Sequence, residues 1–344
     1  DELAIERHGL VVPTGEGHFD FAHGLVRQAL YRALSQPRRR ALHRQIAAAL
    51  SAASADDPRL HGEIVHHASL AGDVPAATRA CLAAGDYCLR VFANAPAAQV
   101  AERGLAQVVD MPHGVERARL EIGLLRLRVA AAAGAGAGGR RLPALAERIE
   151  QAAQVAQALS LHTEAAAGWE LLAYWRQQAS DTGRTEQATL AAARMTRRAD
   201  ATTRCLQLAN SGRCLLDIEA DPARGRALLA EAATLADELG LDVMEIDWAR
   251  GLVARADGDL GSAETALAHA VMLARLAGNH WREYECTVWL AVVALERGRH
   301  AEVLEHVDAI AAAAARMGEP HVPFAQALGA LARLRGRDDS GQSL

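Results

Sequence analysis

Three short motifs have residue types and spacing that could do chemistry. Residues 134–139 read Gly-x-Gly-x-x-Gly, the dinucleotide fingerprint, in which glycines let the backbone approach a pyrophosphate at a helix N-terminus. Glu63 and His66 form an ExxH pair, which places a carboxylate and an imidazole on one helical face, as di-iron bundles require. Residues 18–23 read His-x-Asp-x-x-His. Each motif has to be judged by the element that would hold it.

The elements around these motifs argue against a cofactor or metal site. The residues before 134 have a helical period and no βαβ unit follows, so 134–139 is predicted to be a loop. A di-iron site needs ExxH twice, and no second copy lies in a plausible facing helix. If residues 18–23 form a hairpin that enters a helix, His18 and His23 need not converge. We therefore expect no cofactor and no metal ion.

The sequence also argues against catalysis. It contains no lysine, so all 37 basic residues are arginines, which excludes a Walker-A phosphate lysine and a Schiff-base lysine. It has no GxSxG or HExxH motif and no pair of catalytic carboxylates on a plausible scaffold. The chain is therefore predicted not to be an enzyme.

Bulk properties favour a cytoplasmic protein. The five cysteines are odd in number and never spaced as CxxC, which argues against a disulfide framework and a zinc module. Cys81 and Cys88, seven residues apart, are expected to pack on one helical face.

The net charge of −5 gives no overall electrostatic attraction to nucleic acid or anionic membranes. No run approaches the roughly 18 apolar residues of a membrane span. The N-terminus has no signal-peptide pattern. Because the chain starts with Asp-Glu-Leu and lacks an initiator Met, we expect a piece of a longer protein.

Helical repeats dominate the sequence beyond about residue 55. Hydrophobic residues make up 51% of the chain but aromatic residues only 4%, a composition suited to close helix packing. Gly, Asp or Pro corners recur, and the small residue after each is spaced 37, 38 and 40 residues from the previous one at Ala188, Gly225, Ala263 and Val303. The second helix of each unit then closes on a glycine suited to a left-handed C-cap: Gly240, Gly278 and Gly318.

These units resemble tetratricopeptide repeats. The best match is Gly251, Gly258-Asp259, Ala263, Leu267 and Ala270, with a partial match at Gly72-Asp73, Ala77, Cys81 and Ala84. The units are longer than the family's usual length of about 34 residues, and most helix-A aromatic positions are not aromatic. The resemblance implies divergent helix pairs stacked into a superhelix with a concave binding groove.

The N-terminal segment is of a different kind. Two β-like runs, 10–13 and 18–21, flank Thr-Gly-Glu-Gly, which predicts a hairpin, and helices are predicted at 22–34 and 38–53. The segment resembles the junction in large bacterial signalling ATPases, a family that includes ATPase-coupled LuxR-type regulators and multidomain nucleotidyl cyclases. That resemblance implies a winged-helix-like piece after an ATP-binding switch, with His23 sensing the nucleotide. For His23 the plainer alternative is a helix-start histidine bonded locally.

Two further groups of side chains could bind partners. Helix-A residues line the groove of a repeat superhelix, so five tryptophans are candidates for groove contacts, although each could instead fill the core: Trp169, Trp175, Trp248, Trp281 and Trp289. Arg38–Arg40 with Arg44 form the densest basic patch, which raises the alternative that the N-terminal segment binds DNA. At a switch junction such arginines would face a neighbouring domain or solvent.

We therefore predict an all-α fold, a tetratricopeptide-like superhelix preceded by a small winged-helix-like segment. The expected parts are a junction segment at 1–55, a linker or first divergent repeat at 56–115, a repeat array at 116–335 and a disordered tail at 336–344. The predicted function is that of a regulatory sensor and scaffold. It would bind a protein or small effector in the groove and relay this to an upstream ATPase domain in cis, in transcriptional or cyclic-nucleotide signalling.

Overall fold

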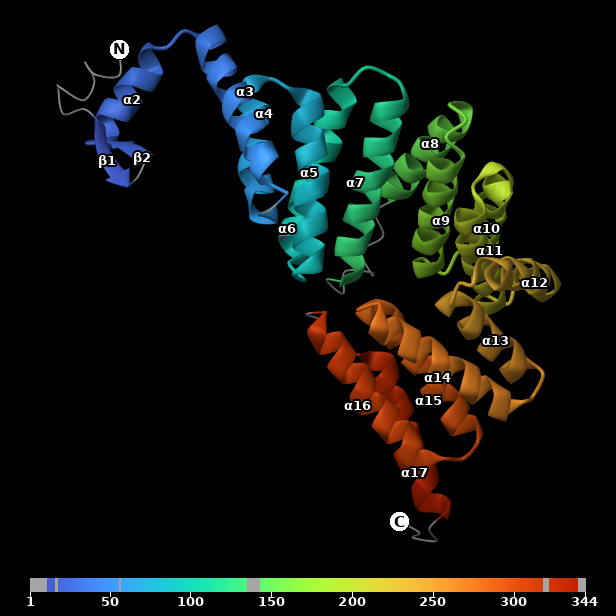
Figure 1. Ribbon diagram of the computed structural model, residues 1–344. Helices are drawn as coiled ribbons and strands as arrows, with labels where there is room; N and C mark the ends of the chain where they lie inside the picture. Colours follow the sequence, from blue (N-terminus) through green and yellow to red (C-terminus); the bar gives the residue numbers. More distant parts are fainter. Residues whose placement is uncertain (1–10, 16–17, 56, 135–142, 318–321, 340–344) are drawn as a thin grey trace. The chain divides into compact units, whose positions relative to one another are not determined.

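The chain is built almost entirely of helices (Figure 1). The structure, a computed structural model, describes residues 11–15, 18–55, 57–134, 143–317 and 322–339. It divides into two compact units, Asp1–Ala84 and Gly85–Leu344. The predicted loop at 135–139 and the glycine cap at Gly318 lie outside the described residues. The four predicted parts, with boundaries at 55, 115 and 335, stay predictions.

The first unit begins with two short antiparallel strands, β1 (Val11–Gly15) and β2 (His18–Phe21). Val11 pairs with Phe21 and Pro13 with Phe19, with an irregular register between Pro13 and Gly15. The helices that follow are α2 (Gly24–Ala33), α3 (Gln36–Ala53) and α4 (His61–Ala71), with a 3-10 turn at Pro58–Leu60 (η1). The two predicted helices are confirmed. Two strands this short do not support a winged helix, which stays a prediction.

Small side chains hold the helices of the first unit together. Ala47 of α3, Ala68 of α4 and Ala77 of α5 (Val74–Arg90) form its buried cluster. Helix α4 ends at Gly72, whose φ of 73° is the left-handed conformation that glycine adopts without steric cost. The predicted Gly72-Asp73 corner therefore turns the chain from α4 into α5.

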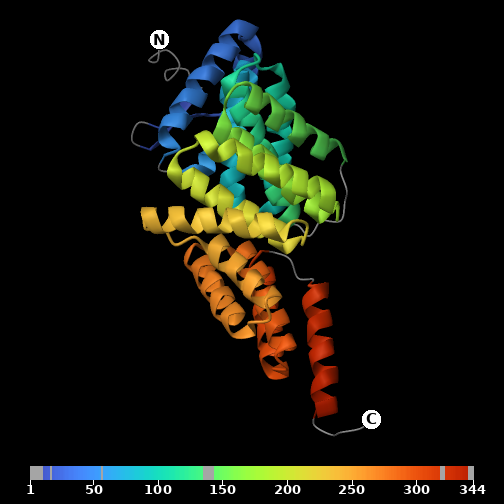
Figure 2. The same ribbon diagram turned by 90° about the vertical axis from the view of Figure 1, so that its right-hand side faces the viewer.

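The second unit is a series of antiparallel helices (Figures 1 and 2). After α5 come α6 (Asn94–Gln107), η2 (Val108–Asp110), α7 (Val115–Gly134), α8 (Pro143–Ala158), α9 (His162–Gln178), α10 (Thr182–Met195), η4 (Thr196–Arg198), α11 (Ala201–Asp217), α12 (Pro222–Leu239), α13 (Met244–Ala256), α14 (Leu260–Leu276), α15 (His280–Glu296), α16 (His300–Arg316) and α17 (Pro323–Asp339). Helices α9–α16 pack as four consecutive pairs, which confirms the predicted units. Helix α17 continues to Asp339, four residues past the predicted boundary at 335, and the disordered tail of 336–344 stays a prediction.

Left-handed residues form the corners between these helices. Gly258 and Gly298 have φ values of 82° and 71°, whereas Ser180 and Glu219 take the same conformation without being glycine, at 58° and 52°. After three of these corners an aspartate caps the next helix; Asp259, for example, accepts a hydrogen bond of 3.0 Å from the Ser262 amide. The corner and the cap together fix where each helix pair folds back.

Glycines set how closely paired helices approach. A Cβ added at Gly212 of α11 would lie 3.0 Å from both the Gly225 carbonyl oxygen and the Leu229 amide nitrogen of α12. A Cβ at Gly251 of α13 would lie 2.6 Å from Leu267 Cγ of α14. The small residues of the repeat pattern are therefore crossing points, where backbones meet with little side chain between them.

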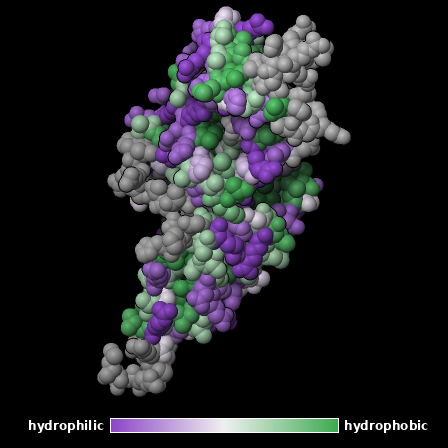
Figure 3. Space-filling view, turned by 90° about the vertical axis from the view of Figure 1, so that its left-hand side faces the viewer, coloured by the Kyte–Doolittle hydropathy of each residue, from purple (hydrophilic) through white to green (hydrophobic). Residues whose placement is uncertain are grey.

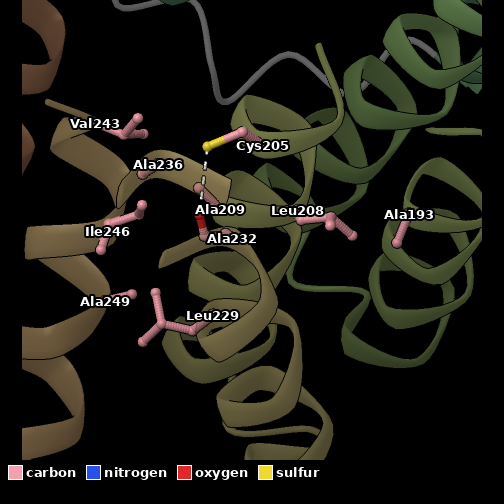
Figure 4. Close-up of a cluster of buried hydrophobic side chains, with 10 residues drawn as sticks. All are labelled: Ala193, Cys205, Leu208, Ala209, Leu229, Ala232, Ala236, Val243, Ile246 and Ala249. Atoms are coloured by element: carbon pink, nitrogen blue, oxygen red, sulfur yellow. Dashed lines mark hydrogen bonds between the residues drawn. The ribbon is translucent and has the colours of Figure 1, made fainter. Parts of the chain in front are cut away.

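Each stack of helices has its own buried cluster of alanine, leucine and similar side chains. Figure 4 shows the one formed by α10 to α13, in which the Cys205 Sγ donates a hydrogen bond of 3.4 Å to the Ala232 carbonyl oxygen. Burial raises the pKa of the Cys205 thiol. Cys81, predicted to be a packed residue, is fully buried, whereas Cys88 is half-buried. No helix among the described residues combines the length and hydropathy needed to cross a bilayer.

A candidate ligand cavity between helices α7, α9, α11 and α15

A cavity of about 430 Å³ lies within the second unit, which we call the α9–α11 cavity. Its walls come from α7, α9, one face of α10, α11 and the first turn of α15. This volume falls within the range of about 300–1,000 Å³ that small-ligand sites occupy. Part of the wall is apolar, including Ile122, Leu171, Tyr174 and Ala192, and the rest carries polar and charged groups.

Helix α11 presents one polar face to this cavity. Gln207, Asn210, Ser211 and Cys214 line it, and their spacing of three, four and seven residues puts them on one side of the helix. Ser211 is 2% exposed and Gln207 8%. The Ser211 Oγ makes no hydrogen bond with the described part of the protein, whereas the Gln207 side chain lies within hydrogen-bonding reach of the Glu170 carboxyl group. Buried polar atoms are nearly always paired, so the unpaired Ser211 Oγ at this wall is unusual.

Glu170 of α9 faces the same space. The Asn210 Nδ2 donates a hydrogen bond to its carboxylate, and Gln207 lies beside it. Burial raises the pKa of Glu170, and the nearby charge of Glu245 raises it as well. Arg282 and the hydrogen bond from the Gln207 side chain lower this pKa, but by less than burial raises it. Protein atoms surround the carboxyl group, but the residue as a whole keeps some accessible surface because it borders the cavity.

Two arginines at the cavity wall stack on a buried tryptophan. The Cζ atoms of Arg213 and Arg282 lie 4.4 Å and 5.5 Å from the ring centroid of Trp248, which is 1% exposed. Both guanidinium groups have acidic partners. Arg213 lies 3.6 Å from Asp217, and Arg282 lies 2.9 Å from Glu285 and 3.7 Å from Glu245. Burial lowers the pKa of Arg282, but these carboxylates more than offset that and raise it. Both arginines are therefore held between carboxylates and the indole ring.

A second cavity, of about 570 Å³, shares four wall residues with the first: Arg126, Leu171, Tyr174 and Arg282. Its other walls include Phe92, His280 and Trp281. The rings of Phe92 and His280 pack with their centroids 5.5 Å apart. The hollow side of these helices thus continues beyond the α9–α11 cavity.

The five tryptophans predicted to line a groove do not gather around one cavity. Trp281 lines the second cavity, Trp169 lines a separate one beside α8 and α10, and Trp175 is 9% exposed. Trp248 belongs to a core cluster, and Trp289 packs against that cluster beneath Arg255. Their role as groove residues stays a prediction.

His23 stands at the N-cap of α2 with an exposed side chain that makes no capping hydrogen bond. The structure therefore does not show the local bond that was the plainer alternative for this residue. Nucleotide sensing by His23 stays a prediction.

The polar residues that do meet, Glu170, Gln207 and Ser211, were not recognised from the sequence. A signal was present, because three polar residues at positions 207, 210 and 211 recur with a helical period in a helix otherwise rich in Leu, Ala and Cys. What the sequence did not show is that Glu170, one repeat earlier, faces them.

A cluster of rings joins the helices of the first unit. The His43 Nδ1 lies 2.8 Å from the His67 Nδ1, and the Tyr31 hydroxyl 2.8 Å from the His43 Nε2. Burial and the charges of His67 and His66 lower the pKa of His43, while burial and His66 lower that of His67. A neutral pair satisfies this contact, since one ring donates and the other accepts. Among the described residues, no three histidine, cysteine or acidic side chains converge as metal ligands.

Comparisons with known proteins show likeness at the level of fold. No family model and no curated protein matches the sequence. The apo form of RapI, 9% identical, has a TM-score of 0.52 over 93% of this chain and 81% of that one. A Rap protein complexed with Competence and Sporulation Factor, 10% identical, has a TM-score of 0.54 over 90% and 79%.

A signal transduction ATPase with numerous domains and a tetratricopeptide repeat sensor, from Pyrococcus horikoshii, gives a TM-score of 0.40 at 13% identity, over 98% of this chain and 58% of that one. This value is too low to support an argument. The two Rap structures show what the helix pairs indicate: the chain has a tetratricopeptide-like helical-repeat fold.

Proposed function

We propose that this chain is a non-enzymatic regulatory sensor that binds a small effector or a protein segment in the α9–α11 cavity. In this proposal it relays occupancy to an upstream nucleotide-dependent switch, in transcriptional or cyclic-nucleotide signalling. The observation that carries the proposal is the buried Ser211 Oγ, which has no hydrogen-bond partner in the described part of the protein, at the wall of a cavity of ligand size. The Rap protein complexed with Competence and Sporulation Factor is an example of a similar fold holding a bound factor.

The position of the cavity supports a relay. Its walls include α9, α11 and α15, which are the first helices of three different pairs. In a repeat array each unit otherwise contacts only its neighbours, so stability is a sum of unit and interface terms. A ligand that touches three units would add energy across several interfaces at once. Its binding would favour one arrangement of those units over others, which is the requirement for passing a signal along the array.

The face drawn in Figure 3 shows no large apolar patch among the residues that the structure describes. In the view of Figure 3, apolar and polar residues are intermixed over the face that is drawn. Exposed apolar side chains do occur, such as Leu25 at 79% and Leu276 at 77%, but single exposed hydrophobic residues are normal on proteins. The cavity is therefore the better candidate for specific recognition.

A ligand screen with a cavity-filling variant tests this function. Ala167 lines the cavity from an exposed position of α9, so Ala167→Leu should narrow the cavity without unfolding the helix. The matched control is Ala268→Leu, at an exposed position of α14 that does not line the α9–α11 cavity. Mixtures of amino acids, nucleotides, sugars, amines and short peptides are screened against the full chain by hydrogen exchange.

We expect a ligand that slows exchange in α9, α11 and α15 together. The ligand concentration needed for this protection should be at least tenfold higher with Ala167→Leu and unchanged with Ala268→Leu. A ligand that protects both variants equally, or protection confined to one helix pair, would show that the cavity is not the sensing site. Nucleoside triphosphates should not be hydrolysed by the chain in the same mixtures.

A further inference from the structure

We propose that the α9–α11 cavity selects a small organic cation, a primary ammonium group attached to a compact apolar body, with the Glu170 carboxylate as its anchor. This inference rests on the proposed function and names the ligand class of the same site. Four observations carry it: the charges around the cavity, the environment of Glu170, the vacant hydrogen-bonding capacity of Ser211, and the apolar wall.

The charges around the cavity leave a negative excess. At its edge, Arg119 pairs with Glu164 at 2.6 Å and Arg126 with Asp86 at 2.7 Å, so these four charges cancel. Arg213 and Arg282, deeper in the wall, are matched by three carboxylates, those of Asp217, Glu245 and Glu285. The surroundings are therefore negative even before Glu170 is counted. An anionic ligand would have to compete with existing partners for both arginines, whereas a cation would not.

Glu170 lacks a cationic partner of its own. Within the described parts of the chain, no arginine or histidine nitrogen lies within the 4.0 Å that defines an ion pair with its carboxylate, and its hydrogen-bonding neighbours are the neutral amides of Asn210 and Gln207. Arg282 and Arg213 act on this carboxylate from beyond ion-pair distance, but the effect of burial is larger. A buried carboxylate without an ion-pair partner is costly, so it favours a ligand that brings a positive charge and N–H donors. An ammonium group supplies both, and its hydrogen bond to a carboxylate is among the stronger kinds.

Ser211 can complete the coordination of such a group. Its Oγ has two lone pairs and no partner in the protein, and it lies one residue after Asn210 on the same face of α11. An ammonium group has three N–H donors, so it can bind a carboxylate and a hydroxyl together. The Asn210 Oδ1 is already taken, because it accepts hydrogen bonds of 3.0 Å and 3.3 Å from Arg213. We therefore assign Glu170 and Ser211 as its acceptors.

The rest of the wall suits an apolar body. The apolar part of the wall consists of Ile122, Leu171, Tyr174 and Ala192. Burial is the main cause that raises the pKa of the Tyr174 hydroxyl; the nearby Glu285 also raises it, and Arg282 lowers it. Tyr174 therefore stays uncharged and presents an aromatic surface. A volume of about 430 Å³ accommodates an amine with a single ring or a short branched chain.

The test uses three probes of one shape and different charge: phenethylamine, 2-phenylethanol and 3-phenylpropionate. Binding to the full chain is measured by titration calorimetry at pH 7.5, with wild type, Glu170→Gln and, as a control, Glu231→Gln. Glu231 is a surface carboxylate of α12 that pairs with Arg204 away from the cavity. Glu170→Gln keeps the size of the side chain and an oxygen that accepts from Asn210, so it should fold.

In wild type, phenethylamine should bind at least tenfold more tightly than 2-phenylethanol, and 3-phenylpropionate most weakly. Glu170→Gln should remove the preference for the amine while leaving the affinity for 2-phenylethanol within about twofold, because a charged hydrogen bond contributes more than a neutral one. Glu231→Gln should behave as wild type. Ser211→Ala should weaken phenethylamine binding severalfold and affect the alcohol less.

Three results would overturn the proposal: a preference for 3-phenylpropionate, an amine preference that Glu170→Gln does not reduce, or no measurable binding of phenethylamine. None of these would by itself remove the proposed sensor function. A neutral, anionic or protein ligand that protects α9, α11 and α15 and is lost in Ala167→Leu would keep the sensor function and reject the ammonium site. Binding of phenethylamine that Ala167→Leu leaves intact would reject this cavity as its site.

Discussion

The crossing of α11 and α12 offers the sharpest test of the packing described above, through the substitution Gly212→Ala. A methyl group there would lie 3.0 Å from two backbone atoms of α12, the Gly225 carbonyl oxygen and the Leu229 amide nitrogen, and 3.4 Å from the Leu228 Cβ. Backbone atoms cannot rotate away as a flexible side chain can. The helices would have to separate, and overpacking of this kind costs about 1–3 kcal/mol.

Helix propensity acts in the opposite direction. Alanine is more favourable than glycine inside a helix by about 1 kcal/mol, so the net destabilisation by Gly212→Ala should be about 0–2 kcal/mol. The matched control is Gly183→Ala in α10, where an added Cβ meets no atom within 4 Å. This control should be stabilised by up to about 1 kcal/mol. The difference between the two variants isolates the crossing and should be about 1–3 kcal/mol.

Hydrogen exchange is the appropriate assay, because a repeat array need not unfold in a single step. Relative to wild type, Gly212→Ala should speed exchange in α11 and α12, and thermal unfolding should rank Gly183→Ala above wild type and wild type above Gly212→Ala. If the two variants are equally stable, the close approach at Gly212 is not a constraint and the reasoning is refuted. Since α11 carries Gln207 and Ser211, the separation should also weaken ligand binding in the cavity.

Four further predictions concern other parts of the chain. Burial raises the pKa of Glu170 in the folded state, so Glu170 destabilises the fold increasingly as the pH rises through that pKa and the side chain ionises. The melting temperature of Glu170→Gln should therefore exceed that of wild type by an amount that grows from pH 5 to pH 8. A difference that does not change with pH would contradict this. The pKa values of His43 and His67 are lowered in the folded state, so the stability that these residues contribute above their unfolded pKa of 6.5 is lost as the pH falls through the folded pKa values. Amide hydrogen exchange in α3 and α4, corrected for the intrinsic rate, should therefore become faster between pH 7 and pH 5. The increase should be smaller in His67→Gln. Glu219→Gly, at a φ of 52°, should stabilise the α11–α12 corner by about 0.5–1 kcal/mol in thermal melts, whereas no change would mean the left-handed residue is not strained. The full chain should not shift duplex DNA at low salt; a shift that weakens with salt would favour the DNA-binding alternative.

The helix pairs were predictable because they depend on local rules. Corners such as Gly258-Asp259, with a left-handed residue and a capping aspartate, are visible in the sequence and mark the fold-back of each pair. The spacing of small residues was equally informative, since Gly225 and Ala263 lie at helix crossings. The corners at Ser180 and Glu219 carry a weaker signal, because these residues adopt the left-handed conformation only where the surrounding helices impose it.

The cavity was not predictable in the same way. The residues that line it depend on which face of each helix turns toward the next. Glu170 and Ser211, 41 residues apart in the sequence, line the same cavity from two different helix pairs. The tryptophans were predicted as groove residues because helix-A residues line the groove of a repeat superhelix, yet Trp248 is 1% exposed. A single sequence does not distinguish a tryptophan that fills the core from one that contacts a ligand, because only the packing in the structure differs between the two. In the first unit, the two helices were predictable from their hydrophobic period, whereas the two short strands do not specify a winged helix.

The stacking of Arg213 and Arg282 on Trp248 has a practical consequence, because it gives the molecule an intrinsic optical reporter. The indole is shielded from solvent, so dissolved quenchers such as iodide should reach it less readily than the half-buried Trp169, Trp281 and Trp289. Both guanidinium groups also border the cavity. A ligand that moves either of them changes the electric field at the ring, and with it the wavelength of its emission. Occupancy of the cavity could thus be followed by fluorescence without attaching a label.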